Sequence, residues 1–190
     1  MNYNLLIEIR DVTPENGNFL EPVSIDEVKS YLRLEGFIDT TESLSTDFDD
    51  DDKLISQLIV SARKRLEEYT GLSFINKKWE MEFDNYAGNF PIPNGPVQYI
   101  VELLDSEQNE ILPTEYKLSA GWGILKYPTW GEMVMTYYGG YEELPAPLKE
   151  AILKEVAYRY TNRGDVNVDA ISREAMALAA PYKQTMTWLG

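Results

Sequence analysis

The chain has 190 residues and a formal net charge of -15, from 32 acidic and 17 basic side chains. It contains no cysteine, which excludes disulfides and cysteine nucleophiles, and no histidine, which removes the usual catalytic triad and most zinc sites. A hydrophobic content of 44% predicts a folded globular protein, and no apolar run approaches the roughly 20 residues of a membrane span.

The first third of the chain predicts two helices after a short strand. Residues 1–10 contain an apolar run typical of a strand and lack the pattern of a secretory signal, so synthesis in the cytoplasm is expected. Ser24 and Glu27 have the spacing of a capping box, which predicts a helix over residues 24–33. A longer amphipathic helix is predicted over residues 50–70, after an acidic loop.

The middle of the chain changes character, because residues 77–138 have a period of two rather than 3.6. Trp79, Met81 and Phe83 alternate with charged residues, as in a half-buried strand, and residues 97–104 form another strand-like run. Glycines and prolines separate these runs. Short strands with close connections predict an antiparallel sheet or a small barrel.

A third helix is predicted over residues 145–163. Pro145 fits its first turn, where a missing N–H costs nothing, and a weaker helical pattern follows over residues 172–180. The sequence therefore predicts an α+β fold, in which a helical bundle of three or four helices carries an inserted small antiparallel β domain.

The run TDFDDDDK, residues 46–53, is the most distinctive charged stretch. A calcium loop of the EF-hand type requires glycine where Asp52 stands and glutamate where Leu58 stands, so the pattern fails. The run also resembles an engineered protease site, but it lies inside a continuous helix pattern. Acids are favoured at the start of a helix by its dipole, which is the simplest interpretation. No metal or cofactor site is predicted.

Two groups of residues are candidates for contacts between proteins. Arg63, Lys64 and Arg65 are either a solvated helix face, paired with acids four residues on, or a surface that meets a neighbouring subunit. Trp122 and Trp130 stand beside glycines in predicted turns, and tryptophan is enriched at protein interfaces. Aromatic residues and carboxylates in the β region also leave open a carboxylate-based hydrolase, although no carboxylate pair is marked by its spacing.

The negative charge is uneven along the chain. Residues 1–52 hold 14 acids and 3 bases, and residues 53–190 hold 18 acids and 14 bases. Tight binding of DNA phosphates needs clustered lysine and arginine, so this surface does not predict it. The acids either serve solubility alone or face DNA without holding it.

Three stretches in this order resemble the head–tail connector proteins (adaptor or head-completion proteins) of tailed bacteriophages and prophages. They are PVSIDEVKSYLRL from Pro22, DDDDKLISQLIVSARKRLEEYTGLSF from Asp49, and VMTYYGGYEELPAPLKEAILKEVAYRYTNRGD from Val134. The resemblance covers residues 22–165. It implies a connector domain there, with an N-terminal extension over residues 1–21 and a C-terminal arm over residues 166–190.

The resemblance also implies a structural, non-enzymatic role in the virion neck. Such proteins form a ring of about twelve copies through head-to-tail contacts, dock on the portal protein, meet the next tail-proximal protein and extend the DNA channel. The implied portal-docking residues are Tyr182, Trp188 and Leu189, and the acids expected to face the channel or a neighbour are Asp47, Asp49, Asp50, Asp51 and Asp52. The alternative is a soluble protein-binding module of the same architecture outside any virion.

Overall fold

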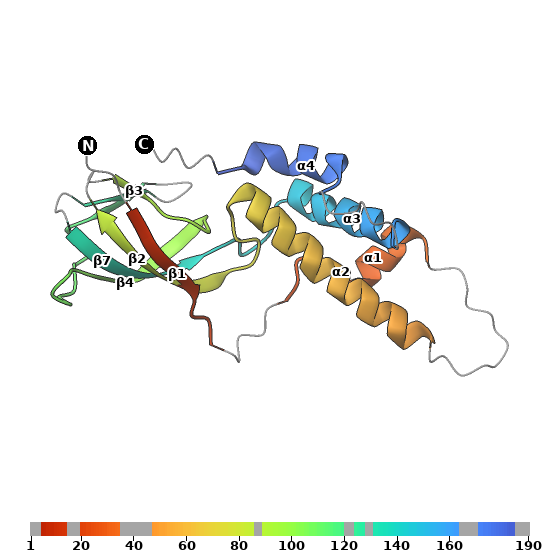
Figure 1. The fold of residues 1–190 in the computed structure, drawn as a ribbon, viewed down its shortest axis with the longest axis horizontal. Helices are drawn as coiled ribbons and strands as arrows, with labels where there is room; N and C mark the ends of the chain where they lie inside the picture. The colour runs from red at the N-terminus through yellow and green to blue at the C-terminus, as the bar shows by residue number, and fades with distance from the viewer. Residues whose placement is uncertain are drawn as a thin grey trace. The chain divides into compact units, whose positions relative to one another are not determined.

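A computed structural model of the protein describes residues 5–14, 20–34, 47–85, 89–119, 124–127, 131–163 and 171–184 (Figure 1). The chain folds as two compact units. The β unit consists of Met1–Phe19, Gly71–Glu142 and Gln184–Gly190, and the helical unit consists of Leu20–Thr70 and Glu143–Lys183. The fold is α+β with antiparallel sheets, as the sequence predicts.

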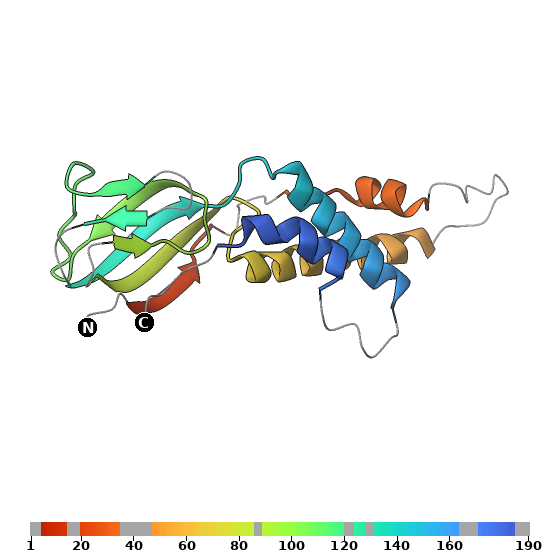
Figure 2. The ribbon, with the colours of Figure 1, turned by 90° about the horizontal axis from the view of Figure 1, so that it is seen from above.

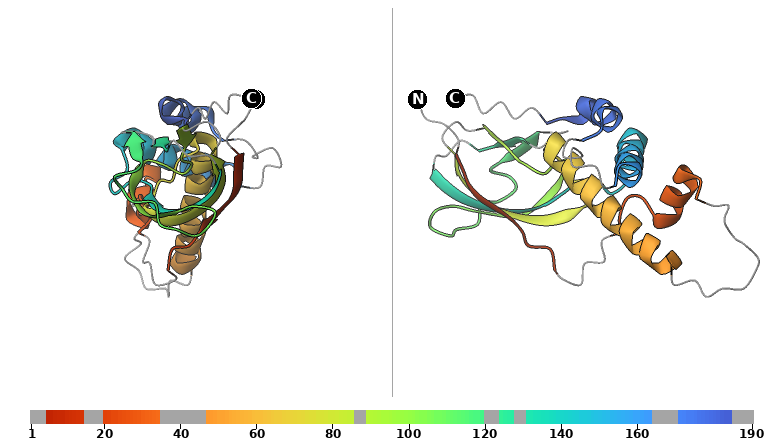
Figure 3. Two further views of the ribbon diagram at one scale, coloured as in Figure 1. Left: turned by 90° about the vertical axis from the view of Figure 1, so that its left-hand side faces the viewer. Right: turned by 45° about the vertical axis from the view of Figure 1, so that its right-hand side comes forward.

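The described part of the helical unit contains helices α1 (Ile25–Leu32), α2 (Asp47–Thr70), α3 (Ala146–Thr161) and α4 (Arg173–Ala179), followed by the short 3-10 helix η1 (Ala180–Tyr182). Helix α3 contacts each of α1, α2 and α4 (Figure 3, right). Buried apolar side chains line these contacts, among them Val28, Ile55, Ile59, Leu66, Leu148, Ile152 and Val156. None of the described helices is both long and apolar enough to cross a membrane.

The start of α1 shows the predicted capping box. The Ser24 hydroxyl accepts a hydrogen bond from the Glu27 N–H at 3.2 Å, and the Glu27 carboxylate accepts one from the Ser24 N–H at 2.7 Å. The helix ends where Arg33 adopts a left-handed conformation with φ of 56°. Two N–H groups that an uncapped helix leaves unpaired are therefore satisfied by the sequence itself.

The β unit contains two antiparallel sheets in its described part. Strands β1 (Leu5–Asp11), β2 (Lys77–Asn85), β7 (Gly131–Gly139) and β4 (Val97–Leu104) form the first in the order β1-β2-β7-β4 (Figure 1). The short strands β3 (Asn89–Pro91), β6 (Ile124–Lys126) and β5 (Lys117–Ser119) form the second (Figure 2). Strand β1 pairs with β2 from Leu5 to Asp11, so the N-terminal segment is part of the sheet.

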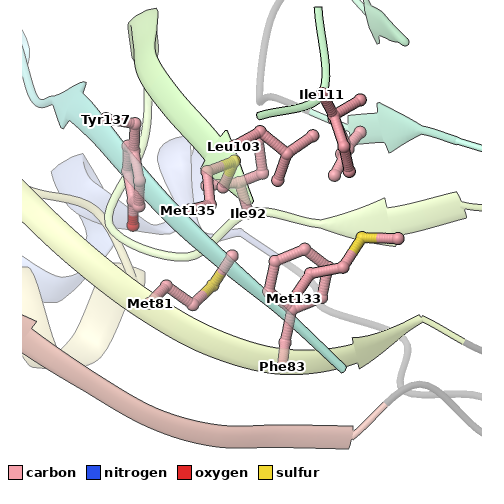
Figure 4. Packing of buried hydrophobic residues seen from close by; sticks show 9 residues of the cluster. Met81, Phe83, Ile92, Leu103, Ile111, Met133, Met135 and Tyr137 are labelled. Atoms are coloured by element: carbon pink, nitrogen blue, oxygen red, sulfur yellow. The ribbon is translucent and has the colours of Figure 1, made fainter. Parts of the chain in front are cut away.

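The core of the β unit follows from the alternation of β2 and β7. Met81 and Phe83 on β2 and Met133, Met135 and Tyr137 on β7 are buried and lie side by side on one face of the sheet (Figure 4). The cluster is completed by Ile92, Leu103, Ile111 and Leu125. The Tyr137 hydroxyl donates to the Pro93 carbonyl at 2.6 Å, which satisfies its polar atom inside this core.

Gly140 explains the paired glycines that follow β7. It adopts φ of 122°, and a Cβ atom there would lie 2.1 Å from the carbonyl oxygen of Ile75. Only glycine tolerates both that backbone conformation and that approach. The second glycine of the YYGGY sequence is therefore required because the backbone at Gly140 passes close to the backbone at Ile75.

Candidate functional site

Arg63 lies buried inside the helical unit, whereas the sequence analysis placed it either on a solvated helix face or on a surface that meets a neighbouring subunit. Its side chain is only 5% exposed. The guanidinium donates to Glu21 through Nε at 2.8 Å and Nη2 at 3.0 Å, and to Glu67 through Nη1 at 2.7 Å. Burial lowers the pKa of Arg63, but hydrogen bonds and charges from Glu21 and Glu67 outweigh it and leave this pKa raised. Arg63 therefore fastens the segment before α1 to α2.

Lys64 and Arg65, which follow Arg63 on α2, are less buried. They border a shallow groove of about 450 Å³ along the helix, which we call the α2 groove. Its remaining lining residues are Ser56, Gln57, Val60, Ser61 and Glu68. Lys64 is exposed and Arg65 is half-buried, so this part of the predicted basic surface remains accessible.

Two aspartates at the acidic start of α2 have described side chains, and both lie near basic residues of the helical unit. Asp52 forms an ion pair with Lys29, and this contact raises the pKa of Lys29. Asp51 lies 4.0 Å from the Arg163 guanidinium. Asp47, Asp49 and Asp50 lie in α2, but their side chains fall outside the described part of the chain.

Four of the five predicted aromatic and apolar contact residues lie outside the described residues: Trp122, Trp130, Trp188 and Leu189. Tyr182 is described and is half-buried in η1. Next to it, the Lys183 ammonium lies 4.8 Å from the centre of the Tyr69 ring, and the Gln184 side chain donates to the Ile92 carbonyl at 3.2 Å.

A second groove, which the sequence did not predict, lies around Leu20 and has a volume of about 370 Å³. We call it the Leu20 groove. Leu20 is 87% exposed at its edge, while Val23 and Ile59 are buried in its floor. The other lining residues are Glu21, Pro22, Ser24, Ile25, Glu27, Ser56 and Lys149. The groove is thus largely apolar, with its charges at the rim.

A projecting turn after β4 is also new. Leu112 is 53% exposed, and its N–H donates to the Glu115 carboxylate at 2.8 Å while its carbonyl accepts from the Glu115 N–H at 2.9 Å. The preceding Ile111 is buried in the core cluster (Figure 4). We call residues 112–115 the Leu112 turn. Its backbone is held on both sides, so it presents an apolar side chain in a fixed position.

The face of the four-stranded sheet that points away from the core is acidic. Residues paired across strands share a face, which places Arg10, Glu80 and Glu102 in one row and Glu8 and Glu82 in the next. The Arg10 guanidinium lies 2.6 Å from Glu80, whose hydrogen bond raises the pKa of Arg10 above its ordinary value. The one arginine in these rows is therefore already paired with a carboxylate.

The described residues contain no group of three or more side chains suited to hold a metal ion. What they do present is a set of contact surfaces: two grooves, a projecting turn and an acidic sheet face.

Solved structures with a similar fold come from GTA particles, two of them described as necks and one as a virion. The chain has a TM-score of 0.69 and 17% identity with a chain of the structure described as "Neck of empty GTA particle computed with C6 symmetry". The values are 0.68 and 16% for "Neck of native GTA particle computed with C12 symmetry", and 0.65 and 18% for "Virion of native gene transfer agent (GTA) particle". Each likeness covers 93% of this chain and 95% of the other.

The fold is thus that of a class of neck proteins. A model of the family described as phage gp6-like head-tail connector protein matches residues 23–118, and the chain belongs to this family. No curated protein matches the chain.

Proposed function

We propose that the protein is a structural adaptor of the virion neck, which assembles as a ring between the portal and the tail and extends the DNA channel. The family match over residues 23–118 carries this proposal. The shared fold over 93% of the chain with proteins of GTA necks supports it. In this role the helical unit, in which α3 packs against α1, α2 and α4, is the helical bundle of the connector. The protein acts through contacts with other proteins rather than through catalysis.

The ring consists of about twelve identical chains in head-to-tail contact. The neck structures of similar fold were computed with C6 and C12 symmetry, which is consistent with such a ring. Rotational symmetry closes a ring only when two different surfaces of the same chain meet. Lys64 and Arg65, beside the α2 groove, are candidates for contacts between subunits, and so are Trp122 and Trp130.

The channel wall carries carboxylates, so that DNA passes without being held. The acidic sheet face supports this idea, because Glu8, Glu80, Glu82 and Glu102 outnumber Arg10 and Lys78 there. Carboxylates repel phosphates, and Arg10 is already neutralised by Glu80. The aspartates at the start of α2, residues 47 and 49–52, are the second group of candidates for the wall of the DNA channel.

The C-terminal arm docks on the portal protein. Its apolar anchors are Tyr182, Trp188 and Leu189. A sharp test removes residues 185–190 only, because Gln184 holds Ile92 within the β unit and Lys183 lies over Tyr69. The truncated protein should keep its fold but lose binding to the portal protein, and unchanged binding would exclude Trp188 and Leu189 as the anchors.

The experiment that tests the proposal combines the purified chain with the portal protein of the same virus. Light scattering should detect a complex, and electron cryo-microscopy should show a ring of this chain beneath the portal. If the chain stays monomeric and unbound while the portal is fully assembled, the adaptor role is wrong. In that case a soluble protein-binding module becomes the better description.

A further inference from the structure

We propose that the Leu112 turn of one copy inserts into the Leu20 groove of the next copy and forms a head-to-tail contact of the ring. The inference rests on the proposed ring and names the two surfaces that meet in it. A ring closed by rotation requires two different, complementary surfaces on each chain. An exposed leucine on a rigid turn and an apolar groove elsewhere on the same chain are such a pair.

The Leu112 turn is organised before any partner arrives. Ile111 is buried, and its N–H donates to the Leu103 carbonyl at 2.8 Å, which holds the base of the turn against β4. Glu115 binds the backbone of Leu112 at both its N–H and its carbonyl. Tyr99 and Val101 are also exposed, but they lie along β4, whereas Leu112 projects from a turn. Little conformational freedom is lost when a side chain held in this way is buried.

The Leu20 groove offers an apolar surface that can receive such a side chain. Its floor is formed by Val23 and Ile59, each 2% exposed, and Leu20 at its edge is 87% exposed. Together with Leu20, these floor residues give the groove an apolar lining against which a leucine side chain can pack. Arg63 holds the neighbouring Glu21 by two hydrogen bonds, so one wall of the groove is fixed to α2.

The two surfaces carry one complementary pair of charges. The Glu21 carboxylate at the groove is hydrogen-bonded to Arg63, and the Glu27 carboxylate keeps its charge while it accepts a hydrogen bond from the Ser24 N–H. Lys149 is left at the groove as a cation with no ion-pair partner among the described residues. On the other surface, Leu112 stands between the exposed carboxylates of Glu110 and Glu115. Insertion of the turn therefore brings the unpaired ammonium toward carboxylates, and the partner that fits is a second copy of this chain.

Disulfide cross-linking tests this contact directly, because the chain has no cysteine of its own. The test variant carries Leu112→Cys and Ser56→Cys, since Ser56 is an exposed residue of the groove. It is oxidised mildly in the ring assembled on the portal. The controls are each single variant and the pair Leu112→Cys with Ser61→Cys, because Ser61 lies on the same helix but lines only the α2 groove.

The double variant should give a ladder of covalent multimers on a non-reducing gel, and the controls should remain monomers. A ring that forms normally without cross-links in the double variant would overturn the inference and leave the adaptor role standing. Absence of any ring from the wild-type chain on the assembled portal would overturn both. A single variant that cross-links to itself as a dimer would also overturn it, because that outcome requires a two-fold contact.

Charge exchange gives a second readout that does not depend on disulfide geometry. Lys149→Glu and Glu110→Lys should each weaken ring formation, and their combination should restore it. Glu110 is chosen because Glu115 holds the turn itself. Leu112→Ala should reduce the association constant of each contact about tenfold, since a buried leucine side chain contributes on that scale. Rings that are indifferent to all of these changes would contradict the proposed contact.

Discussion

Replacement of Arg63 by alanine is the sharpest test of the internal contacts of the helical unit. The guanidinium makes three charge-assisted hydrogen bonds, at 2.7, 2.8 and 3.0 Å, to two carboxylates. Its removal takes away the hydrogen bonds that the carboxylates of Glu21 and Glu67 accept from it. The change should also leave an underpacked region, because the Arg63 side chain is 5% exposed.

The size of the loss can be bounded from the exposure of the two carboxylates. Removing one partner from a fully buried charge pair costs about 3–5 kcal/mol. The Glu21 and Glu67 side chains are 27% and 17% exposed, so water can partly solvate them once the arginine is removed. We therefore expect Arg63→Ala to lower the free energy of unfolding by about 3 kcal/mol. Arg63→Lys should lose about half as much, because it keeps the charge but not the forked geometry.

The assay is urea unfolding followed by far-ultraviolet circular dichroism, which reports mainly on the helices. Lys64→Ala is the matched control, since Lys64 is the adjacent basic residue and is exposed. It should change stability by less than about 0.5 kcal/mol. Equal effects of the two alanine variants would refute the reasoning. In a double-mutant cycle with Glu67→Gln, the losses of unfolding free energy from the two substitutions should not add. If they add, the loss does not arise from the ion pair between Arg63 and Glu67.

Three further predictions concern the β unit. Gly140→Ala should lower the free energy of unfolding by more than about 4 kcal/mol or prevent folding, because the added Cβ would lie 2.1 Å from a backbone oxygen. Gly131→Ala is the control: its Cβ would have no neighbour within 4 Å, so only about 1–3 kcal/mol of backbone strain is expected. Thermal unfolding measures both variants. Tyr137→Phe should cost about 1–2 kcal/mol in the same assay, because it leaves a buried carbonyl without its donor. Burial raises the pKa of Asp11, but hydrogen bonds and the Lys77 charge outweigh it and lower this pKa, so the contribution of the carboxylate is present at neutral pH and is lost as pH falls below about 4. The stability difference between the wild type and Asp11→Asn should therefore shrink on acidification, and a difference that is constant with pH would contradict this contact.

Local signals in the sequence were sufficient where structure depends on neighbours along the chain. The capping box at Ser24 and Glu27 needs only a spacing of three residues, and it is present as predicted. The strand-like run over residues 97–104 coincides with β4, because turn residues bound it on both sides. The pairing of Arg63 with Glu67 also follows from helical spacing.

Burial and long-range pairing were not predictable in the same way. A run of three basic residues is typical of a surface, yet the first of them is buried because Glu21, distant in sequence, reaches it. The acidic sheet face depends on strand register, which joins Glu8 and Glu102 to the acids of β2 across separate strands. Such rows exist only once the order of the strands is known. Exposed leucines give no sequence signal at all, since a single exposed apolar residue is ordinary.

The internal ion pairs bear on how this protein meets DNA, whichever surface lines the channel. A phosphate backbone is held by clustered lysine and arginine side chains that exchange counterions for phosphates. In the helical unit, Arg63, Lys29 and Arg159 are each paired with a carboxylate of the same chain. In the β unit the same holds for Arg10 and Lys77. These cations offer phosphates little, because binding DNA would require breaking contacts that stabilise the fold. Under the proposed function, these internal ion pairs would favour passage of DNA without retention, in addition to the surplus of acids.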